Sequence, residues 1–316
     1  MITVVNPNVG LDYMLFFKGF RKDATMRATR TRWGLGGKGL VAAYLLAGLG
    51  IPVWVTGFSG GIVGEGVRMI LDSGGVETDF VEVKGTARIN VVLKDLSGGW
   101  QSTVTAPGLR VERKDEQELV SRVRQRLSQT SCLILGGSLP PGCSTNLYKK
   151  LIETVVKEDV PCVLDTSGEP FREAVRARPT AIKPNCHEAQ EFLGKEIADE
   201  EDALAAAEEF GRMGIAWAVI TLGADGLVAF GDGGAWYAPP PPLTPKSTAG
   251  AGDAVVAGLA MGLANRFPLQ EAVRWGLAIA AAVMDKWSVL DFQPGEVEHW
   301  KQKIEIVQRK TKKNRA

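Results

Sequence analysis

Short runs of β-branched and apolar residues alternate with amphipathic, helix-like segments along most of this chain. Strands of a parallel sheet carry helices on both faces, so they read as continuous apolar runs and not as alternating ones. The alternation predicts an α/β fold: a doubly wound, mainly parallel sheet flanked by helices. The strand-like runs are ITVV (2–5), VWVTGF (53–58), CLILGG (132–137), CVLDTS (162–167), AIK (181–183) and AVITLG (218–223).

Two segments in the first third of the chain interrupt this rhythm. Residues 10–34 show no helical period, and residues 87–105 alternate like a hairpin with Ser97-Gly98-Gly99 at its turn. They predict a small β-sheet lid over one edge of the main sheet. We expect this lid to expose apolar side chains that could pair edge-on with a second copy of the chain, which makes a homodimer a hypothesis; these are Met14, Leu15, Phe16 and Phe17.

Length and charge limit the remaining possibilities. The 316 residues suit one domain over 1–305, followed by a basic tail over 306–316 that we expect to be a solvated end. Lys plus Arg (37) nearly balance Asp plus Glu (36), so no overall electrostatic field favours nucleic acid or an anionic membrane.

The most apolar stretches, 254–264 and 276–284, fall short of the roughly 20 residues of a membrane span. The start lacks the features of a signal peptide and the cysteines form no CxxC pair, so we expect a cytoplasmic protein.

The segment STAGAGD (247–253) leads into an apolar helical pattern. Glycines at the start of a helix let backbone N–H groups approach an anion, and the helix dipole adds to the attraction. Asp253 among these groups is expected to be ionised and ready to accept a proton from an attacking hydroxyl. Alone, the segment is equally an ordinary helix start, because Asp is favoured there.

A second glycine-rich segment, Gly34 to Gly39, opens the helical pattern LVAAYLLAGLG. Lys38 is followed by glycine and not by Ser or Thr, which disfavours a P-loop, and the segment does not follow the first strand as a dinucleotide fingerprint does. The remaining interpretation is that this segment makes close contact with a small polar or anionic ligand. Trp33 beside this segment is the tryptophan expected to form a pocket wall.

Three further turns end predicted strands: GSLPPG (137–142), KPNCHE (183–188) and TLGADG (221–226). Ligands of open α/β sheets bind beyond the carboxyl ends of the strands, so these turns should face one crevice.

Taken in order, these motifs resemble those of the ribokinase-like (PfkB) carbohydrate kinases, and most closely the branch of 1-phosphofructokinases and tagatose-6-phosphate kinases. The resemblance covers roughly residues 2–290, and so many ordered motifs are far more specific than any one glycine turn. It rests on NPNVGLD (6–12), GGKG (36–39), ARINVVL (87–93), GSLPPG (137–142), LDTSGE (164–169), KPNCHE (183–188), TLGADG (221–226) and STAGAGDA (247–254).

The resemblance implies a role for each matching residue. Asp253 would be the base that deprotonates the acceptor hydroxyl, with an anion hole for the transferring phosphoryl group formed by Gly250, Ala251 and Gly252. Asn185 and Glu188 would organise Mg²⁺ and ATP, partly through water, and the nucleotide would lie at Thr221, Gly223 and Gly226. The sugar phosphate would be held by Asp12, Gly36, Gly37, Lys38, Arg88 and Ser138, with Lys38 and Arg88 on its existing phosphate.

The implied activity is transfer of the γ-phosphoryl group of Mg·ATP to a ketohexose monophosphate, with fructose 1-phosphate first. The next candidate substrates are tagatose 6-phosphate or fructose 6-phosphate, followed by an unphosphorylated sugar or a nucleoside. The last alternative is that the protein is a non-catalytic regulator that binds a sugar phosphate. Two departures from the branch concern the acceptor side: Val41 stands where an asparagine is usual, and Ser102-Thr103-Val104-Thr105 replaces a TEIN-like segment.

Overall fold

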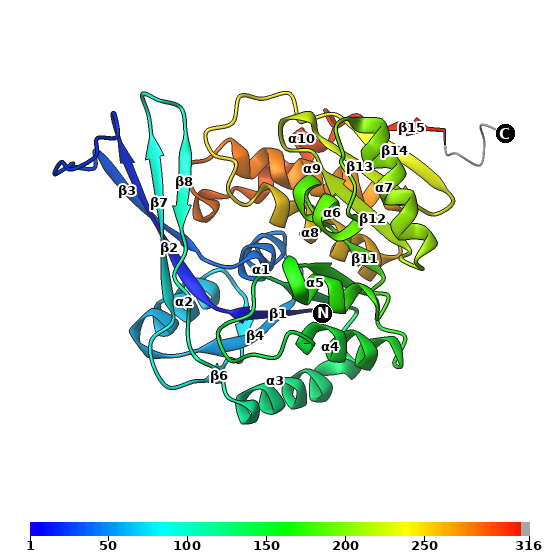
Figure 1. Ribbon diagram of the computed structural model, residues 1–316, viewed down its shortest axis with the longest axis horizontal. Coiled ribbons are helices and arrows are strands. Elements are labelled where there is room, and N and C mark those ends of the chain that lie inside the picture. The colour runs from blue at the N-terminus through cyan, green and yellow to red at the C-terminus, as the bar shows by residue number, and fades with distance from the viewer. Residues whose placement is uncertain (311–316) are drawn as a thin grey trace.

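The computed structural model describes residues 1–310 and shows one large sheet with helices on both faces (Figure 1). Its strand order is β15-β14-β13-β12-β11-β10-β9-β1-β4-β5, with β6 also paired to β4. Pairing is parallel from β12 to β5 and antiparallel from β12 to β15. The strands are β1 (Ile2–Asn8), β4 (Val53–Ser59), β5 (Glu77–Thr78), β6 (Val81–Glu82), β9 (Cys132–Gly136), β10 (Cys162–Asp165), β11 (Ala181–Ile182), β12 (Trp217–Thr221), β13 (Leu227–Gly231), β14 (Gly234–Ala238) and β15 (Val307–Arg309).

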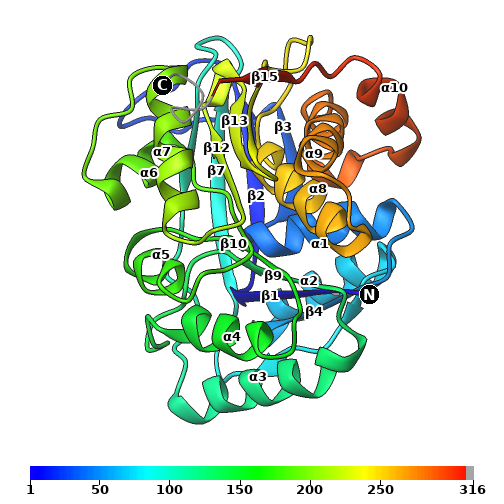
Figure 2. The same cartoon turned by 90° about the vertical axis from the view of Figure 1, so that its right-hand side faces the viewer.

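Helices form a layer on each side of this sheet, as Figure 2 shows. One side carries α1 (Lys38–Gly48), α8 (Ala251–Asn265), α9 (Leu269–Met284) and α10 (Val297–Lys301), with α2 (Gly61–Ser73) beside α1. The other side carries α3 (Arg113–Arg126), α4 (Leu147–Val156), α5 (Gly168–Val175), α6 (Cys186–Leu193) and α7 (Glu200–Arg212). Single turns of 3₁₀ helix are η1 (Leu127–Gln129), η2 (Gly223–Asp225), η3 (Val289–Asp291) and η4 (Pro294–Glu296).

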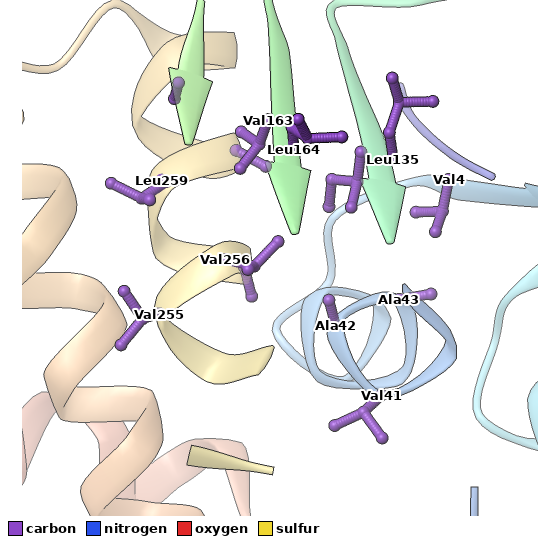
Figure 3. Packing of buried hydrophobic residues seen from close by; sticks show 14 of the residues in the cluster. Val4, Val41, Ala42, Ala43, Leu135, Val163, Leu164, Val255, Val256 and Leu259 are labelled. Carbon is purple, nitrogen blue, oxygen red and sulfur yellow. The ribbon is translucent and has the colours of Figure 1, made fainter. Parts of the chain in front are cut away.

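The core lies between the central strands and the helices on both faces of the sheet, with α1 and α8 on one of them. Every residue of β1 and β9 is buried, as parallel strands covered on both faces require. Figure 3 shows Val4 and Leu135 from these strands near Ala42 and Ala43 of α1. The small side chains of α1 let the helix lie close to the sheet, which fixes its N-terminus beside the strand ends.

A separate four-stranded sheet, which we call the lid, stands at one edge of the molecule (Figure 1). Its strands β3 (Arg30–Leu35), β2 (Gly10–Phe17), β7 (Arg88–Asp95) and β8 (Gln101–Val104) pair in this order, with β2 and β7 parallel. They fall within the two segments, 10–34 and 87–105, that interrupt the helical rhythm, apart from the last residue of β3.

Some sequence expectations are corrected here. Met14, Phe16 and Phe17 are buried within the chain and not exposed on the lid, because Met14 and Phe16 pack with Trp287 and Phe17 packs with Phe20 and Trp100. The expected solvated tail begins with strand β15, which pairs antiparallel with β14; the rest of that tail, 311–316, lies outside the described residues. Within residues 1–310, no helix is both long and apolar enough to cross a membrane.

Candidate active site

A cavity of about 380 Å³ lies where the lid meets the carboxyl ends of the central strands. It gathers residues from motifs far apart in the sequence, as expected for an open α/β sheet. A larger cavity of about 900 Å³ is lined by the ends of α3, α4 and α8 and holds none of the predicted site residues. The predicted residues that line the smaller cavity are Asp12, Gly37, Lys38, Arg88, Ser138, Glu188, Gly250 and Asp253.

Gly250, the N-cap of helix α8, lines this cavity, and its backbone is left-handed (φ 86°). A Cβ atom at this position would also lie 2.6 Å from Cγ2 of Val289, so both conformation and space favour glycine. The first N–H groups of a helix have no intrahelical acceptor. One predicted donor is partly engaged, because the Ala251 N–H donates to the Thr248 carbonyl at 3.3 Å. The helix start therefore presents amides and the positive end of a dipole to the cavity.

Asp253 lies in the first turn of α8 and faces this cavity. Burial, reinforced by the neighbouring Asp165 carboxylate, raises the pKa of Asp253 to about 7, although Lys38 and Lys183 act in the opposite direction. The sequence predicted an ionised carboxylate, whereas the structure places the group near half-protonation at neutral pH. A pKa close to the working pH suits a general base, because the group can both accept and release a proton.

Lys38 sits among acidic groups at the start of α1. Its Nζ lies 2.8 Å from Oδ1 of Asp165 and 3.4 Å from Oε1 of Glu188. Burial acts to lower the pKa of the Lys38 ammonium, but the two carboxylates outweigh it and hold this pKa above its ordinary value. Oδ2 of Asp165 lies 3.5 Å from Nζ of the buried Lys183. The two lysines together keep the pKa of Asp165 below its usual range despite burial.

Asn185 and Glu188 form the N-terminal cap of α6. The Asn185 side chain accepts from the Glu188 N–H at 2.9 Å, and Glu188 Oε2 accepts from the Asn185 N–H at 2.8 Å. This capping box satisfies two free amides and is a structural role in its own right. The second oxygen of Glu188 faces Lys38, so the helix cap also ties α6 to the start of α1.

The lid contributes the opposite wall of the cavity. Oδ1 of Asp12 accepts from Nδ2 of Asn90 at 2.8 Å across the paired strands β2 and β7. Burial raises the pKa of Asp12, while Asn90 and Arg88 oppose the shift. Arg88 donates to the Ala106 carbonyl at 3.3 Å, and its buried Nε has no hydrogen-bond partner among the described residues. An arginine with a free buried donor is suited to a ligand anion.

Glycines bring the lid and the first strand close to this wall. A Cβ on Gly36 would lie 2.7 Å from Oδ1 of Asp12, and one on Gly37 would lie 2.7 Å from the side-chain amide of Asn6. On the remaining side, Ser138 accepts from Nδ2 of Asn8 at 3.1 Å. The glycines of the GGKG segment are thus needed for close approach, which leaves Asp12 free to face the cavity.

The predicted nucleotide-side residues lie next to this cavity and not in its lining. Thr221 ends β12 and forms an isolated parallel bridge with Asn185. Gly223 is the first residue of η2 and Gly226 directly follows it, with positive φ values of 65° and 86°. The turn is therefore connected to the cavity through the cap of α6.

Several residues of the site were not predicted from sequence. Asn90, Lys183, Met14 and Val289 all contact predicted site residues or line the cavity. Asn90 lies within a quoted motif, and its pairing with Asp12 would follow from strand register. Trp33 is not a wall of the cavity: it stacks on Tyr13 with ring centroids 4.5 Å apart, on the other face of the lid.

The residues present fit a magnesium–nucleotide complex better than a protein-held metal. Among residues 1–310 no group of three or more His, Cys, Asp or Glu side chains could hold a metal ion. Mg²⁺ commonly needs only one or two carboxylates, because waters and substrate phosphates complete its shell. Glu188 supplies one carboxylate at the wall of the cavity that also holds the start of α8.

This arrangement can move an anionic group onto a hydroxyl. A carboxylate with a pKa near 7 can accept a proton, a helix start and Lys38 offer positive charge to an anion, and the lid forms the opposite wall of the cavity. Fold and site together define a small-molecule kinase of the α/β class with a β-sheet lid.

Comparison with known proteins narrows this class. Residues 8–293 match the model of the pfkB family of carbohydrate kinases. The chain therefore belongs to that family and is an ATP-dependent sugar kinase. It is 29% identical to a 1-phosphofructokinase of Borreliella burgdorferi (93% of this chain, 94% of that protein) and 30% identical to one of Escherichia coli K12 (91% and 92%). A tagatose-6-phosphate kinase of Staphylococcus epidermidis is 28% identical (83% and 84%). The solved phosphofructokinase-2 from Escherichia coli in complex with substrates and products superposes with a TM-score of 0.88 at 26% identity, covering 95% of this chain and 98% of that one.

Proposed function

We propose that this kinase phosphorylates a ketohexose monophosphate, with fructose 1-phosphate as the first candidate and fructose 1,6-bisphosphate as its product. The observation that carries the proposal is one cavity holding both Asp253 and Arg88, from the core and the lid respectively. The buried Nε of Arg88 has no hydrogen-bond partner among residues 1–310, and a phosphate would accept from it in a stronger, charge-assisted bond than an uncharged sugar could. Relatives named 1-phosphofructokinase and tagatose-6-phosphate kinase support a phosphorylated acceptor.

In this proposal Asp253 takes the proton of the attacking hydroxyl, and the first amides of α8 donate to the transferring phosphoryl oxygens. Asp12, fixed by Asn90, accepts from a hydroxyl of the sugar. Asn185 and Glu188 would hold Mg²⁺ through water, which neutralises phosphate charge, and the nucleotide would extend over Thr221, Gly223 and Gly226.

For Lys38 we propose a part different from the one expected. Its ammonium is bound to Asp165 and Glu188 and contributes to the electrostatics of Asp253. We therefore propose that Lys38 stabilises the transferring phosphoryl group, which leaves Arg88 as the main cation for the phosphate already on the sugar.

The test is ADP release from Mg·ATP with fructose 1-phosphate, fructose 6-phosphate, tagatose 6-phosphate and free fructose. Turnover of a phosphorylated sugar, lost in Asp253→Asn, is the expected result. Turnover of free fructose alone would refute the substrate class. Binding of ATP and sugar phosphate without turnover would make the protein a regulator. Arg88→Met should raise KM for the phosphorylated sugar about 10- to 100-fold, the range for a lost charge-assisted contact of roughly 1.5–3 kcal/mol.

We also propose a homodimer through the lid, in a reducing cytoplasm. The face of the lid turned away from the cavity exposes Trp33, Ile89 and Val104 by 45%, 40% and 60%. Large apolar side chains exposed on one face of a sheet are typical of a protein–protein interface. The four cysteines are free thiols, which agrees with a reducing compartment.

A further inference from the structure

The segment just after α9 carries contacts that the proposed catalytic mechanism does not use. Three consecutive residues, Trp287, Ser288 and Val289, each touch a different part of the site's surroundings. Ser288 Oγ donates to the Trp33 carbonyl on β3 at 3.0 Å. Val289 lines the cavity and fills the space above Gly250 at the start of α8. The segment therefore lies between the lid and the anion-binding end of α8.

Trp287 is inserted into the inner face of the lid. It packs against Met14, Phe16 and Val92, which form a small buried cluster separate from the main core. The Phe16 and Trp287 rings meet edge to face, with centroids 5.6 Å apart. The cluster thus joins the segment after α9 to the lid by apolar contact, on the same face of β2 as Asp12.

Two cations of the lid cover the Trp287 ring. The Arg30 guanidinium carbon lies 4.4 Å from the centroid of Trp287 and 4.6 Å from that of Phe16. The buried Arg30 Nε has no hydrogen-bond partner among the described residues, so its guanidinium is committed to the rings. Lys94 Nζ lies 5.1 Å from the same ring and donates to the Lys246 carbonyl.

Lys246 connects this contact to the phosphoryl site. Its N–H and that of Ser247 both donate to the Met284 carbonyl at the end of α9, and its Nζ lies 3.0 Å from Oδ1 of Asp285. The loop then runs through Ser247 directly to Gly250 and α8. Lid strand, Trp287 segment and anion-hole loop are thus held by one continuous set of contacts.

We propose that Trp287 is a positioning residue that docks the lid on the core and aligns the acceptor wall with the start of α8. Trp287 is not among the residues that line the cavity, and it acts through Phe16, Arg30 and Lys94. The part of this inference that concerns acceptor binding rests on the proposed function; the docking of the lid does not.

Loss of this contact has a defined chemical consequence. With the lid undocked, a water oxygen can attack the γ-phosphorus of ATP in place of the sugar hydroxyl. The new O–P bond forms as the bond from the γ-phosphorus to the β,γ-bridging oxygen breaks, and ADP, phosphate and a proton are released. ATP hydrolysis without acceptor therefore reports lid docking.

The experiment compares Trp287→Ala and Trp287→Phe with Trp275→Ala as matched control. Trp275 is also half-buried and carries a cation, Lys301 at 4.0 Å, but it lies in α9 away from the lid. Amide hydrogen exchange is measured in the lid strands β2 and β7 and in the central strand β9. In the same variants we measure KM for fructose 1-phosphate and ATP hydrolysis without acceptor.

For Trp287→Ala we expect lid amides to exchange about tenfold faster with β9 unchanged, since local opening is distinct from global unfolding. KM for the acceptor should rise about 10- to 100-fold, because a small displacement of the acceptor wall can reduce activity that much. The ratio of ATP hydrolysis to phosphoryl transfer should increase. Trp287→Phe should restore most of the slow exchange in the lid and most of the low KM for the acceptor. Equal exchange in the lid for Trp287→Ala and Trp275→Ala, or equally faster exchange in β9, would overturn the inference. If the unmodified enzyme leaves fructose 1-phosphate unreacted, the proposed acceptor fails while exchange still decides whether Trp287 docks the lid.

Discussion

At the scale of single residues, the protonation state of Asp253 determines how the enzyme responds to pH. Its pKa is raised to about 7, so the proton-accepting form is lost as the pH falls below that value. We expect kcat/KM for the acceptor to fall about tenfold per pH unit below pH 7 and to level off above it, because kcat/KM reports the free enzyme. A pH–rate profile checks this.

Asp253→Asn provides the control for that profile. Its activity should be about 10²- to 10⁴-fold lower and should lack the limb near pH 7, since no base remains to titrate. A limb near pH 4 in the unmodified enzyme would contradict the effect of burial and of Asp165 on this carboxyl.

One substitution at Lys38 can distinguish stabilisation of the transferring phosphoryl group from binding of the phosphate already on the sugar. Lys38→Met should lower kcat about 10²-fold with little change in the acceptor KM, as for a lost donor to the transferring group. Lys149→Met is the matched control, because Lys149 is 35% exposed against 37% for Lys38 and also pairs with a carboxylate. A raised acceptor KM with unchanged kcat would instead place Lys38 on the sugar's own phosphate.

The ordered motifs that resemble the kinase family were enough to predict that Asp12, Arg88 and Asp253 belong to one site. Asp12 and Arg88 lie on the lid strands β2 and β7, Asp253 lies in the first turn of α8, and all three line the cavity. The motifs were not enough to predict the environment of Lys38. Its partner Asp165 is 127 residues away in the chain, and only the packing of β10 beside β9 brings it near. The local sequence pattern around Lys38 contains no information on a contact with a residue so far away in the chain.

At the scale of elements, two helices on one face of the sheet pack without room for a side chain between them. A Cβ atom on Gly258 of α8 would lie 2.3 Å from the backbone nitrogen of Gly276 in α9. Gly258→Ala should therefore lower the free energy of unfolding by about 1–3 kcal/mol, the usual range for overpacking, measured by urea denaturation.

The control for this variant is Gly295→Ala, whose added Cβ meets nothing within 4 Å. It should leave the urea midpoint nearly unchanged. Because α8 also carries Asp253, Gly258→Ala should reduce activity as well. Equal stability of the two variants would show that α8 and α9 separate easily and that their close contact is unimportant.

Most elements could be predicted from the apolar runs and glycine turns, since buried parallel strands have a distinctive composition. The C-terminal strand β15 could not. Its residues, Val307–Arg309, are mostly exposed and its sequence is basic, so it resembles a solvated end. It is held by pairing with β14 and by the ion pair of Arg309 with Glu200, neither of which is visible locally.

At the scale of the whole molecule, the exposed face of the lid predicts an assembly. Trp33→Asp should convert a dimer into a monomer, because a charge in an apolar contact is poorly solvated. Mass photometry or sedimentation at micromolar concentration measures this. Met69→Asp, on α2 at 71% exposure, is the control and should leave the mass unchanged. A monomeric mass for the unmodified protein would refute the dimer.

The presence of a lid could be predicted, but its inner and outer faces were assigned incorrectly for Met14 and Phe16. Alternation along a strand tells which residues share a face and not which face meets the core. That choice is made by Trp287, which follows α9 and fills the inner face.

The central position of β1 has a consequence for how the chain is made. Its partners are β4 and β9, so β1 stays unpaired on one side during synthesis until residue 136 has also left the ribosome. The lid can pair earlier, since β7 ends at Asp95, whereas α8 with Asp253 comes late. During synthesis the acceptor wall can thus form well before the base that acts on the acceptor, and an interrupted chain can present a sugar-facing surface with no means of phosphorylating what it holds.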